Sequence, residues 1–172
     1  MDMEALSNLI AVVIGGLLAT TGGIISTLIV ERQRRKIESR NLALAFKGEV
    51  AAIIENVEFR KYDQRFGQVI EQIEASGQPF FMAFRLRFSY DRIYEENAER
   101  VGALRGSLPE QIPFFYTLMH SVMEDMSSLG DGTFANLELD LLLRIYRDAR
   151  RGLQTMTGRG RAIIQEIDRL YS

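Results

Sequence analysis

The sequence contains no cysteine and a single histidine, and both shortages exclude kinds of chemistry. Without cysteine the chain has no disulfide framework, no thiolate zinc site and no cysteine nucleophile. A carboxylate-bridged metal centre in a helical bundle needs Glu-x-x-His pairs on facing helices, which one histidine cannot supply. His120 and Glu124 lie four residues apart on one helical face. We nevertheless interpret His120 as a hydrogen-bonded or surface residue and predict no bound metal.

Motifs of catalysis and of cofactor binding are also missing. The sequence has no G-x-S-x-G nucleophile elbow. Its glycine-containing stretches at residues 129–132 and 157–161 match no phosphate-binding loop. Carboxylates are plentiful, but acid–base catalysis requires a pocket that perturbs their pKa values. We therefore predict a protein that is not an enzyme and that binds no cofactor.

The part of the chain after Val30 has no excess of either charge. All 21 Lys and Arg residues lie after Val30, and so do all but two of the 23 Asp and Glu residues. This part is therefore formally neutral, whereas nucleic-acid-binding domains usually carry a clear basic excess. We expect no nucleic acid among the partners of this protein.

Charge is missing altogether from residues 5–30. As a helix rising about 1.5 Å per residue, Leu9–Val30 would be roughly 33 Å long, enough to cross a hydrocarbon core of about 30 Å. A cleavable signal peptide has basic residues before its apolar run, whereas here Asp2 and Glu4 precede it. The uncharged run is also too long for most buried helices of soluble cores. We predict one transmembrane helix over residues 5–30.

Basic residues follow the uncharged run at once. Five of the ten residues in Glu31–Arg40 are Arg or Lys, namely Arg32, Arg34, Arg35, Lys36 and Arg40. The positive-inside rule places them in the cytoplasm. We therefore predict residues 1–4 outside and residues 31–172 inside, in a single-pass protein of the bacterial inner (cytoplasmic) membrane. The same basic side chains would lie at the level of anionic lipid headgroups, so they act as a topogenic signal, as lipid contacts, or as both.

Small residues recur along the predicted span at helical spacing. They include Gly15, Ala19, Gly22, Gly23 and Ser26. In lipid, small side chains let helix backbones approach closely and associate. Glycine and alanine are also common in any transmembrane segment. We favour a packing face, which we call the small-residue face, against a second copy of the chain or against another membrane protein.

The remainder of the sequence has the apolar periodicity of amphipathic helices. Spacings of three and four predict helices over residues 31–60, 66–76, 91–104, 107–129 and 133–170. No helix-breaking pair separates the span from the first of these helices, so we expect the two to be continuous. Ser107 and Glu110 match a capping box. The predicted fold class is all-α, with one N-terminal transmembrane helix followed by a cytosolic antiparallel bundle of four to five helices.

Two further surfaces are candidates for partner contacts. Residues 80–90 alternate with a period of two, which we interpret as an extended connector or the start of the next helix. The aromatic density of this segment makes Phe81 and Phe84 candidate contacts, with a core-filling role as the alternative. Arg144, Arg147 and Arg151, together with Arg150, Arg159 and Arg161, form a basic stripe on the last predicted helix. This stripe is either a site for an acidic partner or phosphate, or a solvated face.

One stretch resembles known sequences. Residues 93–104, IYEENAERVGAL, followed by Leu108-Pro109, Ile112 and Phe115-Tyr116, resemble a stretch found in a group of uncharacterised bacterial proteins. Those proteins also begin with one short membrane anchor and continue as a cytosolic helical domain. The resemblance covers residues 41–124 with gaps, implies the same topology and a bacterial origin, and carries no activity. Within it we expect Gly102 to let helices approach and Asn97 to hydrogen-bond a backbone group.

These patterns favour a membrane-anchored assembly or accessory protein without catalytic activity. It would pack through the small-residue face and through its cytosolic bundle, with the lipid bilayer and a membrane protein or a second copy as partners. The alternative is a membrane-anchored signalling or defence effector whose bundle senses a partner or a ligand.

Overall fold

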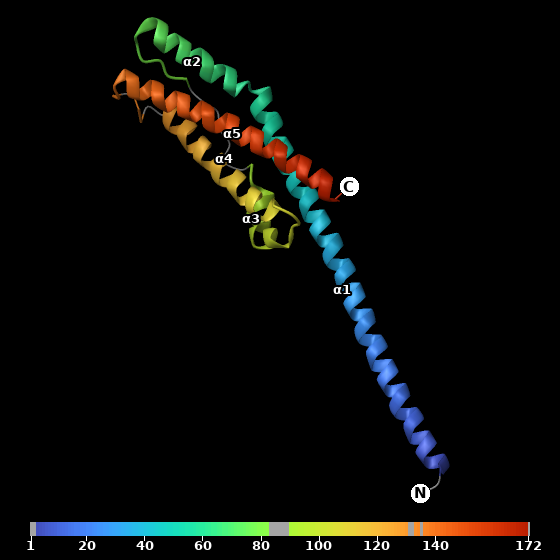
Figure 1. The fold of residues 1–172 in the computed structure, drawn as a ribbon. Helices are drawn as coiled ribbons and strands as arrows, with labels where there is room; N and C mark the ends of the chain where they lie inside the picture. The colour runs from blue at the N-terminus through green and yellow to red at the C-terminus, as the bar shows by residue number, and fades with distance from the viewer. Residues whose placement is uncertain (1–2, 83–89, 131–132, 135, 172) are drawn as a thin grey trace. The chain divides into compact units, whose positions relative to one another are not determined.

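The computed structural model describes residues 3–82, 90–130, 133–134 and 136–171, without the side chains of residues 4–22, 24 and 25. Within these ranges every regular element is helical, as Figure 1 shows. The elements are α1 (Met3–Phe59), α2 (Tyr62–Ser76), α3 (Arg92–Asn97), a 3-10 helix (Ala98–Ala103), α4 (Leu108–Gly130) and α5 (Leu139–Tyr171). The predicted all-α fold with a helical bundle is confirmed.

The chain divides into two units, Met1–Arg40 and Asn41–Ser172. The helix α1 runs through this division without a break, which confirms the expected continuity between the uncharged run and the first helix of the bundle. Among the parts of the helices whose side chains are described, none is long and apolar enough to cross a membrane. Most of the predicted span over residues 5–30, including Gly15, Ala19 and Gly22, lies outside the described side chains.

The turn between α1 and α2 consists of Arg60 and Lys61. Lys61 has a positive φ of 54°, a left-handed conformation that residues with side chains adopt uncommonly. α2 then ends at Gly77, which has a φ of 62° and donates its N–H to the carbonyl of Ile73 at 3.0 Å. Glycine adopts this C-cap conformation without steric cost. The predicted end of this helix at residue 76 is confirmed.

One hydrophobic core joins the helices of the second unit. The pair α4 and α5 runs side by side in opposite directions, and α2 packs along α5 (Figure 1). Each long helix contributes a fully buried aromatic ring, namely Phe46 from α1, Phe66 from α2, Tyr116 from α4 and Tyr146 from α5. The Phe66 and Tyr146 rings meet edge to face with centroids 6.1 Å apart, which ties α2 to α5.

Gly160 lets α5 approach its neighbours closely. A Cβ atom at this position would lie 2.7 Å from Ile54 Cδ1 and 2.8 Å from Phe115 Cε2. Ile54 belongs to α1 and Phe115 to α4, so the absence of a side chain at Gly160 allows three helices to pack together.

At Gly102, by contrast, an added Cβ would have nothing within 4 Å, so the predicted role of this residue in helix approach is wrong.

The helix predicted over residues 91–104 is interrupted. Asn97 leaves the helical region, with φ −129° and ψ 10°, and a 3-10 helix follows. Its side-chain amide donates to the carbonyl of Ile93 at 2.9 Å, as expected for a backbone contact. That carbonyl is the one that the Asn97 N–H would use in a continuous helix, so the side chain competes with the helix.

Two helix starts also differ from the predictions. Ser107 Oγ accepts a hydrogen bond from Gln111 Nε2 at 2.7 Å, whereas the predicted capping box paired Ser107 with Glu110. The last helix begins at Leu139 instead of residue 133, because a turn in which Leu137 N–H bonds to the Phe134 carbonyl at 3.2 Å precedes it.

Candidate functional site

The predicted aromatic contact surface lies partly against the core. Phe81 is half-buried and packs on the hydrophobic core, in keeping with the core-filling alternative. The neighbouring Phe80 carbonyl accepts a hydrogen bond from Tyr146 Oη at 3.3 Å. Phe84 lies outside the described residues.

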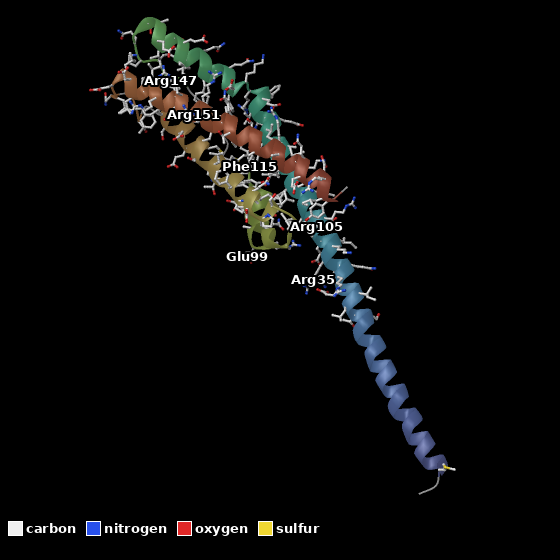
Figure 2. All side chains as sticks on the ribbon, viewed as in Figure 1. Arg35, Glu99, Arg105, Phe115, Arg147 and Arg151 are labelled. Atoms are coloured by element: carbon white, nitrogen blue, oxygen red, sulfur yellow. The ribbon has the colours of Figure 1, made fainter. Side chains whose placement is uncertain are left out.

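The predicted basic stripe on α5 is largely engaged in ion pairs. Arg147 and Arg151 extend from α5, as Figure 2 shows; Arg147 pairs with Glu74 of α2, and Arg151 pairs with Asp148 at 3.5 Å. Arg144 is exposed and has no ion-pair partner among the residues that the structure describes. Of these three arginines, Arg144 alone lacks an ion pair among the described residues, and the positive charge of the other two is balanced by carboxylates of the chain.

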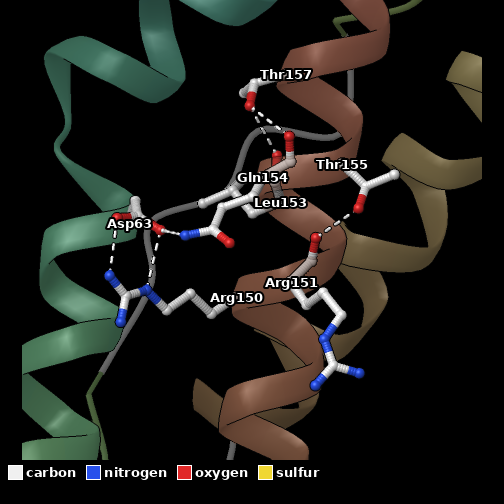
Figure 3. Close-up of polar contacts among 7 residues, drawn as sticks. All are labelled: Asp63, Arg150, Arg151, Leu153, Gln154, Thr155 and Thr157. Atoms are coloured by element: carbon white, nitrogen blue, oxygen red, sulfur yellow. Dashed lines mark hydrogen bonds and ion pairs between the residues drawn. The ribbon is translucent and has the colours of Figure 1, made fainter.

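Arg150, a further member of the predicted stripe, makes the most specific contact of this face. Its Nε and Nη2 donate to the two carboxylate oxygens of Asp63 on α2, each at 3.0 Å (Figure 3). Gln154 Nε2 donates to the same carboxylate at 2.7 Å. The hydrogen bond from Arg150 is the main cause that lowers the pKa of Asp63. This bidentate contact joins α2 to α5, and its role is structural.

The basic cluster after Val30 separates into two groups. Arg34 pairs with Glu38 at 3.1 Å and Arg35 with Glu31 at 2.9 Å, in both cases within α1. The hydrogen bond from Arg35 is the largest cause that lowers the pKa of Glu31. Arg32 and Lys36, four residues apart on one side of the helix, have no ion-pair partner among the described residues.

The residues just before this cluster are apolar and open to solvent. Leu28, Ile29 and Val30 are 54%, 50% and 61% exposed. Of the small-residue face, Ser26 is exposed, and a Cβ added at Gly23 would have nothing within 4 Å. Three consecutive exposed aliphatic side chains on one helix mark a surface that is suited to lipid or to another helix.

A recess beside α4 brings together residues that are distant in sequence. His120 Nε2 lies 2.6 Å from Asp91 Oδ2, and Asp91 is only 3% exposed. The recess has a volume of about 310 Å³, and its polar lining consists of Asp91, His120, Glu124, Ser127 and Ser128. We call it the Asp91–His120 recess. Tyr90, Met119 and Met123 form its apolar wall.

The apolar wall of the recess is shared with a smaller cavity on its other side. Tyr90, Met119 and Met123 also line an apolar cavity of about 40 Å³, together with Met126 and Met156. Methionine side chains are flexible and polarizable, so they adapt to irregular guests. The recess therefore combines a polar opening with a deformable apolar wall.

Glu49 on α1 holds the Asp91 segment in place. Its carboxylate accepts the N–H groups of Ile93 at 2.6 Å and Tyr94 at 3.1 Å, and also the hydroxyl of Tyr116. The Tyr94 and Tyr116 rings stack with centroids 4.1 Å apart. Burial is the largest cause that raises the pKa of Tyr116, followed by the hydrogen bond to Glu49. Since Glu49 caps the start of α3, the Asp91 carboxylate is left to face His120.

The geometry of the recess does not form a nucleophile–base pair. His120 and Ser127 are seven residues apart on α4, which separates them by about 10 Å along the helix axis. A hydroxyl must lie within hydrogen-bonding distance of the imidazole to be activated by it. Among the described residues, no group of three or more His, Asp and Glu side chains is arranged to hold a metal ion.

Sequence reasoning paired His120 with Glu124 and missed Asp91. Asp91 and His120 are separated by all of α3, the 3-10 helix and the first half of α4, so no local spacing connects them. The available signal was the histidine itself, because it is the single imidazole of the sequence.

No family model matches this chain, and neither a curated protein nor a solved structure matches it.

Proposed function

We propose that this chain is a single-pass membrane protein that holds a membrane complex together and performs no chemistry itself. Its uncharged run over residues 5–30 would cross the bacterial inner membrane, with the N-terminus outside and the bundle in the cytoplasm. The observation that carries the proposal is the change in charge at Val30–Glu31, where an uncharged run is followed by five basic residues within ten positions.

Two features of α1 support this proposal. The helix continues from the uncharged run into the buried core of the second unit, so the anchor and the bundle would share one continuous helix. Leu28, Ile29 and Val30 are exposed at the point where the membrane boundary would lie, followed immediately by Glu31 and the basic cluster. An aliphatic surface next to basic side chains is the arrangement expected at a membrane interface.

The small-residue face supports an assembly role. Its members Gly23 and Ser26 are open among the described side chains, and small residues allow close helix approach in lipid. Thr27 Oγ1 donates to the Gly23 carbonyl of its own helix at 2.9 Å, so this hydroxyl needs no outside partner in lipid. The partner would be a membrane protein or a second copy of the chain.

Reporter fusions after Ser172 test the anchoring and its direction. We expect a cytosol-active reporter to function and a periplasm-active reporter to remain inactive, with the chain in the membrane fraction after alkaline washing. If the protein is recovered entirely in the soluble fraction, the proposal fails. If only the periplasm-active reporter works, the orientation is wrong.

A membrane-anchored signalling or defence effector is the second candidate function. The observation that favours it is the Asp91–His120 recess, because a scaffold has no need for a polar opening with a methionine wall. Growth arrest on overexpression that depends on Gly15, Gly22 and Gly23 would favour this role. A complex that purifies at fixed stoichiometry would favour the scaffold.

A further inference from the structure

We propose that the Asp91–His120 recess binds a small organic cation, consisting of a primary ammonium group on an apolar body. This inference concerns the second unit alone and does not depend on membrane anchoring. It is carried by the charge, the unpaired acceptors and the shape of the recess.

The charges that line the recess favour a cation. Asp91 and Glu124 contribute two carboxylates, and no Lys or Arg is present among the described lining residues. Glu124 has no ion-pair or hydrogen-bond partner among the residues that the structure describes. The acidic character extends beyond the recess: burial raises the pKa of the neighbouring Asp125, and the charges of Glu124 and Asp148 raise it further. An anion would meet unfavourable charge on entering.

Acceptor atoms remain open inside the recess. His120 Nε2 contacts Asp91 Oδ2, whereas Asp91 Oδ1 has no hydrogen-bond partner among the described residues. Every fully buried side-chain oxygen and nitrogen of the described residues has a hydrogen-bond partner. Because Asp91 Oδ1 has no such partner, it is not fully buried and is accessible from the open side of the recess. The half-buried hydroxyls of Ser127 and Ser128 also lack partners within the described chain. An ammonium group supplies three donors for such acceptors.

The apolar wall and the volume of the recess determine the chemistry and the size of the remainder of the ligand. Tyr90, Met119 and Met123 separate the recess from the core, and the smaller cavity behind them is lined by further apolar side chains. A volume of about 310 Å³ is at the lower end of small-molecule sites, so the ligand is a small amine and not a lipid or a nucleotide. The Tyr90 ring adds a surface that attracts cations.

The single histidine makes this proposal directly testable. Because His120 is the only histidine in the chain, its imidazole signals in a histidine-labelled NMR sample report on the recess alone. The full-length protein, in detergent if it requires one, is titrated with phenethylamine. The neutral 2-phenylethanol and the anionic 3-phenylpropanoate serve as comparison ligands, because they keep the aromatic body and change the charged group.

We expect phenethylamine to shift the His120 signals saturably and to bind at least fivefold more tightly than either comparison ligand. Glu124→Gln should weaken binding about threefold, the size of effect expected for one exposed charge. Glu110→Gln, an exposed carboxylate on the same helix outside the recess, is the matched control and should leave binding unchanged. Asp91→Asn should weaken binding at least tenfold, provided that its circular dichroism spectrum matches the parent.

Three results would overturn the proposal. The first is the absence of a saturable shift with phenethylamine. The second is equal binding of 2-phenylethanol, which would show that the recess recognises only the apolar body. The third is an equal effect of Glu124→Gln and Glu110→Gln, which would show that the lining carboxylate does not contact the ligand. Because Glu124 makes no described contact that supports the fold, its variant remains informative even if Asp91→Asn fails to fold.

Discussion

The carboxylate of Glu49 and the hydroxyl of Tyr116 form a hydrogen bond that connects α1 to α4 across the core of the second unit. Tyr116 is fully buried, and Glu49 also accepts two backbone N–H groups from the start of α3. One side chain therefore fixes three elements, and the Asp91–His120 recess depends on that placement.

Removing the charge of Glu49 should destabilise the bundle. The amide of Glu49→Gln has one acceptor oxygen and no charge, so it cannot maintain all three hydrogen bonds that the carboxylate accepts from the Tyr116 hydroxyl and the two backbone N–H groups. We therefore expect a loss of about 1–3 kcal/mol in the free energy of unfolding. Urea unfolding of the full chain, followed by circular dichroism, measures this loss. Glu55→Gln, an exposed carboxylate on the same helix, is the control and should change stability by less than about 0.5 kcal/mol. Equal midpoints for the two variants would contradict the role of Glu49.

Adding one methyl group at Gly160 should also destabilise the bundle. The new Cβ would lie under 3 Å from Ile54 and Phe115, so Gly160→Ala forces α5 away from both neighbours. We expect a cost of about 1–3 kcal/mol. Gly158→Ala lies in the same helix with nothing within 4 Å, so the better helix propensity of alanine should stabilise it by about 0.5–1 kcal/mol. Changes of the same sign in both variants would show that α5 does not pack closely at Gly160.

The contact between Asp63 and Arg150 should make stability depend on pH. The pKa of Asp63 is below its ordinary value of 3.8 in the folded chain, so the contact contributes fully above that value. The contribution is lost as the pH falls through the lower folded pKa. We therefore expect Asp63→Asn to lower the urea midpoint at neutral pH and the two midpoints to converge as the pH falls below 3.8. A constant difference at all pH values would contradict an ionic contact.

Enlarging the small-residue face should disrupt assembly while leaving membrane insertion intact. Gly22→Leu and Ala19→Leu keep or raise hydrophobicity, so insertion should persist. Both add bulk where helix backbones would meet, so close packing should be lost. The readout is the size of the detergent-solubilised complex, or co-purification of a native membrane partner.

Leu17→Ala and Ile25→Ala, which lie mostly off the small-residue face, are the controls for that experiment. They should assemble nearly as well as the parent. If the Leu variants also assemble normally, the small residues are incidental. The exposed Arg144 and the Asp91–His120 recess would then be the next surfaces to test.

Local sequence patterns were sufficient for the helices and for some of their ends. The period of three to four predicted the helices that include Phe46, Phe66 and Phe115, and the predicted end of the second of these helices, at residue 76, is the end of α2. Such signals are contained within a few neighbouring residues, because helix formation and capping depend on contacts three or four positions apart. The change in charge at Val30–Glu31 is of the same local kind and leads directly to the anchoring proposal.

Only the tertiary structure decided which distant side chains meet. The break at Asn97, the close approach at Gly160, the fork between Arg150 and Asp63, and the pairing of Asp91 with His120 all became visible in the fold. The sequence makes Gly160 look like a weak point in a helix, whereas the packed core makes it a point of contact. The physical reason is that periodicity identifies the buried face of each helix, whereas the packing of several helices together determines what that face touches.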